Sequence, residues 1–88
     1  MYEWDPNKNR LNQAKHGIRF EDAYTVLEDP RSFTIYDDRD DEDRQITIGM
    51  DDTGRILVVV YTYRGENIRI ISARKASKKE VNNYEGRI

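Results

Sequence analysis

The residues best suited to chemistry are arginines that stand inside strand-like apolar sequence. One apolar run ends in Arg64, and the run IRIISARKAS at 68–77 contains Arg69 and Arg74. An arginine is always charged, and its planar guanidinium can donate two parallel hydrogen bonds to the oxygens of a carboxylate or a phosphate. Arg64, Arg69 and Arg74 are therefore candidates for binding an anion.

The charge distribution points to the same half of the chain. The formal net charge is −2 over 88 residues. Residues 1–53 hold 7 Lys and Arg against 14 Asp and Glu, a net charge of −7, whereas residues 54–88 hold 8 against 3, a net charge of +5. An anionic partner is therefore expected to meet the C-terminal half.

Composition excludes several classes of site and of protein. The chain has no cysteine, which rules out disulfides, thiolate catalysis and cysteine-ligated zinc. No apolar stretch approaches the roughly 20 residues of a membrane span, and the first ten residues lack the apolar segment of a signal peptide. We expect one soluble, cytoplasmic domain over residues 1–88, without a cofactor or a membrane contact.

The segment DDRDDED at 37–43 places six carboxylates around one arginine. A calcium loop of the EF-hand type would need a glycine at its turn and a glutamate at its end, and the segment has neither at the required spacing. A run of like charges is more typical of a solvated connection. We therefore expect no metal site here.

End signals and periodicity predict the elements of an α+β fold. Asp5-Pro6 is typical of a helix start and Gly17 of a helix end. Ser77–Glu80 has the spacing of a capping box, which begins a last short helix. The expected elements are a strand at 2–4, helices at 6–16 and 20–28, strands at 32–36, 44–50, 55–64 and 67–74, and a helix at 78–85.

The short connections between the last three strands predict an antiparallel meander. A two-residue turn at Gly65-Glu66 would pair Tyr63 with Ile68, Tyr61 with Ile70, Val59 with Ser72 and Leu57 with Arg74. A four-residue loop at 51–54 would then place Ile48 opposite Leu57 and Ile46 opposite Val59. In this register the helices cover one face of the sheet, which holds Ile46, Ile48, Leu57, Val59, Tyr61, Tyr63, Ile68 and Ile70.

The other face of the predicted sheet is mixed, with an apolar middle and a cationic margin. It holds Gln45, Thr47, Val58, Val60, Thr62, Arg64, Arg69 and Ile71. Arg74 projects from the helix side in this register, at the end of its strand. A one-residue slip would exchange the two faces, so the assignment depends on the lengths of the turns.

Motifs along nearly the whole chain resemble a known family. The stretches that carry the resemblance are WDPNK at 4–8, NQAKHGIRFEDA at 12–23, RQITIG at 44–49, GRILVVVYTYRG at 54–65 and IRIISARKA at 68–76, with Glu80 and Tyr84. Together they resemble the BrnT family of toxins, also known as the DUF497 domain. The sequence departs from the family pattern at Arg19, where relatives often have a small residue that caps the next helix, and in the acidic segment 37–43.

The resemblance implies a type II toxin with a RelE-like fold, in which N-terminal helices pack on one face of an antiparallel sheet and a short helix ends the chain. It implies a ribonuclease that inhibits translation. It also implies a partner, a BrnA-like antitoxin that binds the toxin through one part and operator DNA through another. RNA would be the substrate, and DNA would be bound only through the antitoxin complex.

The resemblance also suggests roles for the charged residues. Metal-free RNA cleavage needs a base for the 2'-OH proton, an acid for the departing 5'-oxygen and fixed cations for the phosphate. Arg64, Arg69 and Arg74 would bind the substrate and stabilise the transition state. His16, the single histidine, would serve as general acid or base, although a histidine at a helix end also caps carbonyls and is favoured by the helix dipole. Both interpretations of His16 remain open.

Three further residues are expected to contact the substrate. Lys15 and Lys75 would meet phosphates, and Tyr84 would donate a proton or stack on a base. Each has a simpler interpretation, since lysines at helix and strand ends are commonly solvated and a tyrosine on a helix face commonly packs. Glu80 is explained by the capping box, which leaves general-base catalysis as its minor role.

Two hypotheses from different functional classes follow. The first is an RNA-cleaving toxin held inactive by an antitoxin. The second is a non-catalytic module on the same scaffold, whose basic sheet face docks a protein or a nucleic acid. The absence of an unambiguous acid and base pair favours the second, and the family motifs favour the first, which we adopt.

Overall fold

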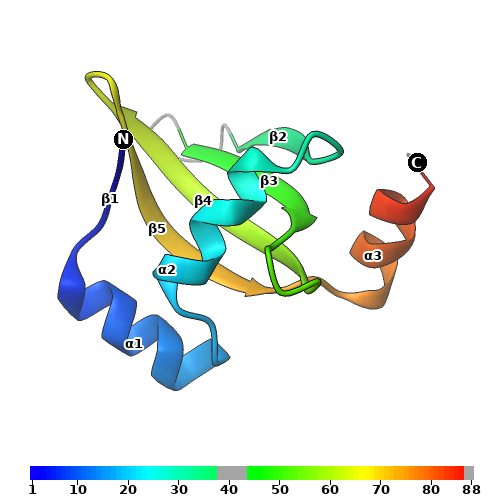
Figure 1. Ribbon diagram of the computed structural model, residues 1–88, viewed down its shortest axis with the longest axis horizontal. Coiled ribbons are helices and arrows are strands. Elements are labelled where there is room, and N and C mark those ends of the chain that lie inside the picture. Colours follow the sequence, from blue (N-terminus) through cyan, green and yellow to red (C-terminus); the bar gives the residue numbers. More distant parts are fainter. Residues whose placement is uncertain (38–43, 87–88) are drawn as a thin grey trace.

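The computed structural model describes residues 1–37 and 44–86 and is built around a mixed sheet of five strands (Figure 1). The strands are β1 (Tyr2–Glu3), β2 (Phe33–Asp37), β3 (Arg44–Met50), β4 (Ile56–Arg64) and β5 (Asn67–Lys75), in the order β1-β5-β4-β3-β2. The meander of β3, β4 and β5 is antiparallel, as predicted, and β2 pairs with β3 in the same antiparallel manner. β1 pairs with β5 in parallel, so the prediction of an antiparallel sheet is wrong for this edge.

The helices form where local signals predict them. α1 (Pro6–His16) begins at Asp5, whose side chain accepts a hydrogen bond from Asn7 N, and ends at Gly17 with a φ of 72°. α3 (Lys78–Glu85) begins with the complete capping box of Ser77 and Glu80. Between them the predicted second helix divides into α2 (Phe20–Ala23) and the 3₁₀ helix η1 (Tyr24–Glu28). None of the described helices is long and apolar enough to cross a membrane.

The main core lies between α2, η1 and one face of the sheet (Figure 1). Phe20, Ala23 and Val26 are fully buried there, and Trp4 and Tyr24 pack against them while partly exposed. The sheet residues of this core are Leu57, Val59, Tyr61, Ile70 and Ala73, with Ile68 partly buried beside them. The predicted helix-facing residues of β4 and β5 are thus confirmed, except that Tyr63 is 58% exposed.

The prediction for β3 is wrong by one residue. Ile48 pairs with Val58 and Ile46 with Val60, which turns both isoleucines away from the helices. Thr47 takes the helix side instead. The cause is a connection of five residues, 51–55, in which the Asp51 carboxylate accepts the N–H groups of Thr53 and Arg55. A side-chain period of two converts this single extra residue into a complete exchange of faces.

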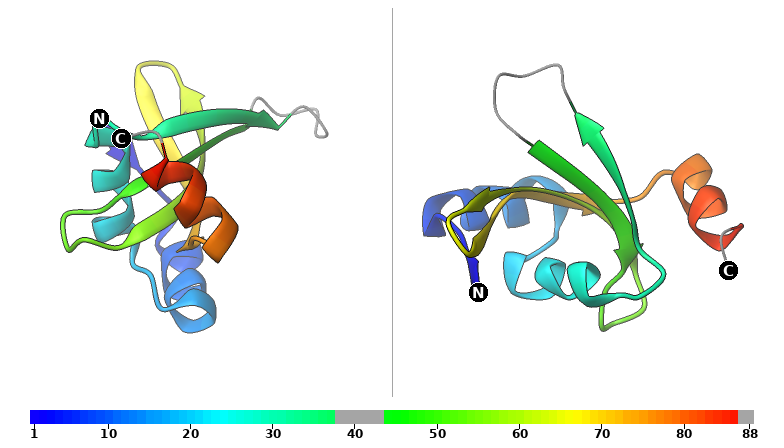
Figure 2. Two further views of the ribbon diagram at one scale, coloured as in Figure 1. Left: turned by 90° about the vertical axis from the view of Figure 1, so that its right-hand side faces the viewer. Right: turned by 90° about the horizontal axis from the view of Figure 1, so that it is seen from above.

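A second, smaller core lies on the opposite face of the sheet. Tyr84 of α3 packs against Ile48 and Val58, with Phe33, Ile46, Ile56 and Ala76 partly buried around them. Figure 2 shows α3 beyond one end of the sheet, apart from α1 and α2. The sheet is therefore covered by helices on different faces at its two ends.

Asn12 fastens α1 to the outer edge of β5. Its side chain is buried, with 7% of the residue exposed. Asn12 Nδ2 donates to Ala73 O at 2.8 Å and to Ile18 O at 2.9 Å, and Asn12 Oδ1 accepts from Ala73 N at 3.1 Å. β1 covers β5 only at Ile68 and Arg69. The amide of Asn12 thus satisfies backbone groups farther along that edge, where no strand pairs with them.

Candidate functional site

A β-bulge in β5 places three arginines on one face of the sheet. Tyr61 pairs with Ile70 but Val60 pairs with Ser72, so Ile71 is an extra residue in β5. Beyond it Arg74 pairs with Val58, on the face opposite α2. The predicted pairs of Val59 with Ser72 and of Leu57 with Arg74 are therefore wrong. We call this surface, which carries Arg64, Arg69 and Arg74, the arginine face.

At the turn end of the arginine face, Arg69 is held by a glutamate from β1. Arg69 Nη1 donates to Glu3 Oε2 at 2.8 Å, and Asn67 Nδ2 donates to Glu3 Oε1 at 3.0 Å. The hydrogen bonds from Asn67 and then from Arg69 lower the pKa of Glu3. Only one of the five N–H groups of Arg69 is occupied by this pairing among the described residues.

Arg64 stands beside this pair at the end of β4. It lies opposite Asn67 across a two-residue turn, as predicted, and the φ of 59° at Gly65 is the left-handed value that the first turn residue requires. The side chain is exposed. Its positive charge helps to lower the pKa of Glu3 without a direct hydrogen bond between them. Arg64 therefore offers its guanidinium to solvent and to any anion on this face.

At the other end of the arginine face, Arg74 forms a bidentate ion pair with Glu80 of α3. Arg74 Nη1 lies 2.8 Å from Glu80 Oε1, and Arg74 Nη2 lies 3.0 Å from Glu80 Oε2. Glu80 also accepts from Ser77 N at 2.8 Å as part of the capping box. The hydrogen bond from Arg74, with the help of Ser77, lowers the pKa of Glu80 to about 2.

His16, Lys15 and Lys75 lie away from the arginine face. His16 is half-buried as the last residue of α1, and Lys15 is exposed beside it. Lys75 is exposed at the end of β5 and pairs with Leu57, on the helix side. His16 follows Asn12 by one helical turn on the same side of α1, and Asn12 is bonded to Ala73 near the end of β5. We call Arg64, Arg69 and Arg74 the face group and Lys15, His16 and Lys75 the edge group.

Tyr84 belongs to the small core and not to an open surface. The residue is 2% exposed, and its hydroxyl donates to Asp29 Oδ2 at 2.6 Å. Burial and this hydrogen bond raise the pKa of Tyr84 to about 12. The structure supports the packing interpretation of Tyr84, so we do not retain it among substrate contacts.

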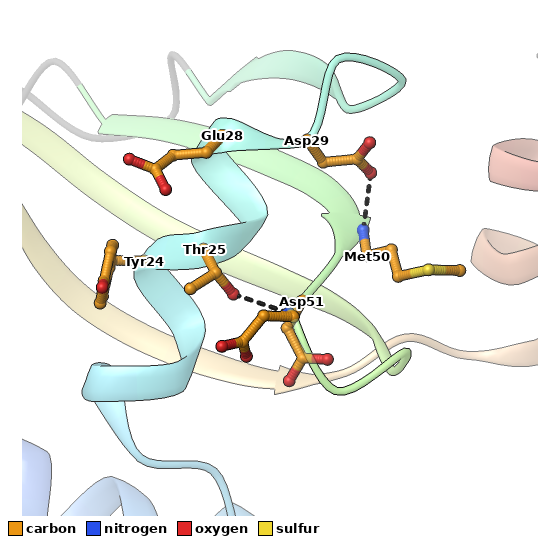
Figure 3. Close-up of a pocket in the computed structure, with 7 residues that line it drawn as sticks. Tyr24, Thr25, Glu28, Asp29, Met50 and Asp51 are labelled. Atoms are coloured by element: carbon orange, nitrogen blue, oxygen red, sulfur yellow. Dashed lines mark hydrogen bonds between the residues drawn. The ribbon is translucent and has the colours of Figure 1, made fainter.

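An acidic pocket of about 470 Å³ opens beside η1 (Figure 3). It is lined by Tyr24, Thr25, Glu28, Asp29, Met50, Asp51 and Asp52. Asp29 Oδ2 accepts from Met50 N at 2.8 Å, and Asp52 N donates to Thr25 Oγ1 at 3.0 Å, so the lining is tied to η1 by structural hydrogen bonds. Its carboxylates would repel phosphates, which leaves the arginine face as the candidate for binding nucleic acid.

Three residues of structural importance to the site escaped the sequence prediction. Glu3 and Glu80 were not expected to pair with arginines, and no role was expected for Asp29. Glu3 lies 66 positions before Arg69, so no local signal indicates their contact. Asp29 lies 55 positions before Tyr84. Glu80 follows Arg74 by only six positions, but the contact depends on the bulge and on how α3 docks.

The described residues contain no group of three or more His, Cys, Asp or Glu side chains arranged to hold a metal ion. The acidic segment 37–43, considered above as a possible cation loop, lies outside the described residues from position 38 onward.

Comparisons with known proteins identify the family. A family described as "Ribonuclease toxin, BrnT, of type II toxin-antitoxin system" matches residues 4–80. The fold is similar to the crystal structure of the Brucella abortus ribonuclease toxin BrnT, with a TM-score of 0.71 and 30% sequence identity over 89% of this chain and 99% of that chain. No curated protein matches the sequence. Because the family match spans most of the chain and the fold agrees, this protein belongs to the BrnT family of ribonuclease toxins of type II toxin-antitoxin systems.

Proposed function

We propose that this toxin binds RNA on the arginine face and cleaves it by attack of a 2'-OH on the adjacent phosphate. The observation that carries the proposal is the placement of Arg64, Arg69 and Arg74 on one face, although they come from two strands and are separated by a bulge. The cations have open N–H groups and lie in the basic half of the chain. A planar guanidinium can form bidentate hydrogen bonds with two oxygens of a phosphate.

In the proposed reaction the P–O2' bond forms and the P–O5' bond breaks. A base accepts the proton of the 2'-OH, an acid protonates the leaving 5'-oxygen, and the products carry a 2',3'-cyclic phosphate and a 5'-hydroxyl. The arginines stabilise the charge on the transferring phosphate. We propose that the reaction is metal-free and that these arginines supply the fixed positive charge that the phosphate needs.

His16 is the proposed general acid or base, with Lys15 and Lys75 as phosphate contacts at the same edge. Lys75 follows Arg74 at the end of β5, and Lys15 and His16 end α1, which Asn12 attaches to β5 at Ala73. An RNA strand that crosses from the arginine face to this edge would meet both groups of residues. His16 can act on the substrate only if the RNA strand passes around the end of β5.

Membership of the BrnT family supports a proposal about the biological setting. We propose that the protein acts in the cytoplasm as an RelE-like endoribonuclease, inhibits translation by cutting RNA and is neutralised by a BrnA-like antitoxin. Operator DNA would be bound through the antitoxin in the complex. Support for an antitoxin comes from the type II description of the family.

One observation favours a non-catalytic alternative. The only histidine lies off the arginine face, and two of the three arginines already pair with carboxylates. A basic face without a nearby acid and base would dock a nucleic acid or a protein without cleaving it. The experiment must therefore separate binding from cleavage.

The test compares the wild type with R64A/R69A under tightly controlled expression, and follows growth and RNA integrity. K8A/R10A is the matched control, since it removes two exposed cations from the first half of α1 and leaves the arginine face intact. We expect growth arrest and RNA fragments with 5'-hydroxyl ends in cells that express the wild type or the control. The purified wild type and control should cleave RNA in the presence of EDTA. R64A/R69A should be folded and inactive. A folded wild type that binds RNA without cleaving it would establish the docking alternative instead.

A further inference from the structure

The hydrogen bonds of Arg74 leave one particular pair of its donors open. Its guanidinium has five N–H groups. Nη1 uses two of them, on Glu80 Oε1 at 2.8 Å and on Lys75 O at 3.2 Å, and Nη2 uses one on Glu80 Oε2 at 3.0 Å. The remaining two, on Nε and Nη2, are parallel neighbours along one side of the planar group. None of the described residues accepts them, and the side chain is 45% exposed.

The carboxylate that holds Arg74 is itself fixed. Ser77 N donates to Glu80 Oε1 at 2.8 Å, and Glu80 N donates to Ser77 Oγ at 3.2 Å. The Glu80 side chain is tied to the start of α3 by the Ser77 N–H, and α3 is tied to the sheet through Tyr84. Glu80 stays charged throughout the neutral range, because its pKa is about 2. The plane of the guanidinium is therefore set by the position of α3.

We propose that Glu80 is a positioning residue, which orients Arg74 so that its open side, Nε–H and Nη2–H, meets one phosphate of the RNA backbone. The inference rests on the proposed function, since it supposes that RNA is the substrate. Two parallel donors match two phosphate oxygens. A donor pair that is already oriented stabilises the transition state without further reorganisation.

Because Glu80 is negatively charged, its role in orienting Arg74 can be distinguished from an attraction of RNA to the site. A carboxylate beside the phosphate site opposes binding of the ground state, so its removal should not weaken the binding of RNA. Its removal would free the guanidinium to rotate, which affects the step in which alignment matters most. Loss of Glu80 should therefore lower kcat and should not raise KM.

The capping box supplies two matched variants. E80Q keeps a residue that suits the third position of a capping box, but its amide has only one acceptor oxygen and no charge for Arg74. S77A removes the hydroxyl that caps Glu80 N and leaves the carboxylate on Arg74. A role limited to capping α3 predicts greater damage from S77A, whereas a positioning role predicts greater damage from E80Q.

The experiment measures kcat and KM for cleavage of a defined RNA by the full chain, for the wild type, E80Q, S77A, R74A and R74A/E80Q. Circular dichroism confirms that each variant is folded at the assay temperature. We expect E80Q to lower kcat about tenfold with KM unchanged or reduced. S77A should stay within about twofold of the wild type, and E80Q should have no further effect in the R74A background.

Three results would overturn the inference while the proposed function stands: an E80Q kcat equal to or above that of the wild type, an S77A loss as large as that of E80Q, or an undiminished E80Q effect in the absence of Arg74. A wild type that neither binds nor cleaves RNA would overturn the proposed function, and this inference with it.

Discussion

Asn12 and Ala73 are joined by two hydrogen bonds of 2.8 and 3.1 Å, through which a side chain of α1 pairs with the backbone of β5 as a neighbouring strand would. The contact is buried and spans 61 positions of sequence. It fixes α1 against the strand that carries Arg69 and Arg74. The proposed edge group at His16 depends on this attachment.

Replacement of Asn12 should destabilise the fold strongly. Asn12→Leu has a similar size but leaves Ala73 N, Ala73 O and Ile18 O buried without partners. We expect a loss of about 2–5 kcal/mol in the free energy of unfolding, measured by urea denaturation. Gln13→Ala, an exposed change at the next position of α1, is the control and should stay within about 0.5 kcal/mol of the wild type. Equal stability of the two variants would contradict this role of Asn12.

The ion pair of Glu80 predicts a pH-dependent part of the stability. Its pKa is lowered from 4.5 to about 2 by pairing with Arg74, so the unfolded chain binds more protons between these values. The stabilisation is present above pH 4.5 and is lost as the pH falls through about 2.

Comparison with E80Q isolates this contribution. The difference in unfolding free energy between the wild type and E80Q should be largest near neutral pH and should shrink by about 1 kcal/mol toward pH 2, a modest value because solvent screens the partly exposed pair. Asp29 and Asp51 also have lowered pKa values, because hydrogen bonds outweigh their burial. Both proteins share these groups, so they cancel. A difference that does not vary with pH would refute the assignment.

Tyr84 should matter for stability and not for RNA cleavage. Tyr84→Phe removes the hydrogen bond to Asp29 and is expected to cost about 1–3 kcal/mol, because the acceptor is charged and the site is buried. The variant should keep kcat and KM once the assay temperature is lowered below its unfolding transition. A fall in kcat at unchanged stability would restore Tyr84 to the substrate contacts.

The same tyrosine gives an alkaline signature. Its pKa is raised from 10.0 to about 12, so the stabilisation that its protonated hydroxyl contributes is complete below pH 10 and is lost as the pH rises through about 12. Ultraviolet titration of the wild type should show one more tyrosine that ionises near this upper value than titration of Tyr84→Phe. Identical curves would show that the hydroxyl is not held by Asp29.

Gly49 should tolerate no side chain. A Cβ at this position of β3 would lie 2.8 Å from Ser32 Cβ and 3.1 Å from Val26 Cγ1, inside the contact between the sheet and η1. Gly49→Ala is expected to lower the unfolding free energy by about 1–3 kcal/mol through overpacking. Adding Ser32→Gly removes the nearest atom and should restore part of the loss. Additive losses in the double variant would argue against the contact.

RNA binding should depend on salt through the arginine face. On a 2'-O-methylated RNA that resists cleavage, removal of one phosphate contact reduces the slope of log K against log salt by about 0.7. We expect this reduction for Arg64→Ala, because Arg64 is exposed and no side-chain hydrogen bond joins its guanidinium to another described residue. Lys8→Ala should leave the slope unchanged. A slope that is insensitive to Arg64 would place RNA elsewhere on the molecule.

The parts of the fold that could be predicted are those encoded locally. Asp5-Pro6, Gly17 and the capping box at Ser77–Glu80 define helix ends through neighbouring residues, and α1 and α3 have the predicted bounds. The Gly65-Glu66 turn likewise set the first pairs of β4 with β5 correctly. Each of these signals acts within a few positions of the chain.

The parts that could not be predicted depend on irregularities and on distant partners. The β3–β4 connection gained a residue because Asp51 organises it with its own side chain, and this reversed the faces of Ile46 and Ile48. The bulge at Ile71 reversed the end of β5. The pairing of Arg69 with Glu3 joins elements from opposite ends of the chain. For this reason the shared face of Arg64 and Arg69 could be predicted from sequence, whereas the position of Arg74 on that face and the carboxylate partners of Arg69 and Arg74 could not.

The bulge at Ile71 also changes how relatives should be aligned. Arg69 and Arg74 are separated by five positions, an odd number that would put them on opposite sides of a regular strand. A relative with a regular strand and a separation of four would present the same two cations to the same side. An alignment gap of one residue within IRIISAR would then preserve the site, whereas an ungapped alignment would match residues that face opposite ways. When members of this family are compared, the side of the sheet that each arginine faces matters more than the number of residues between the arginines.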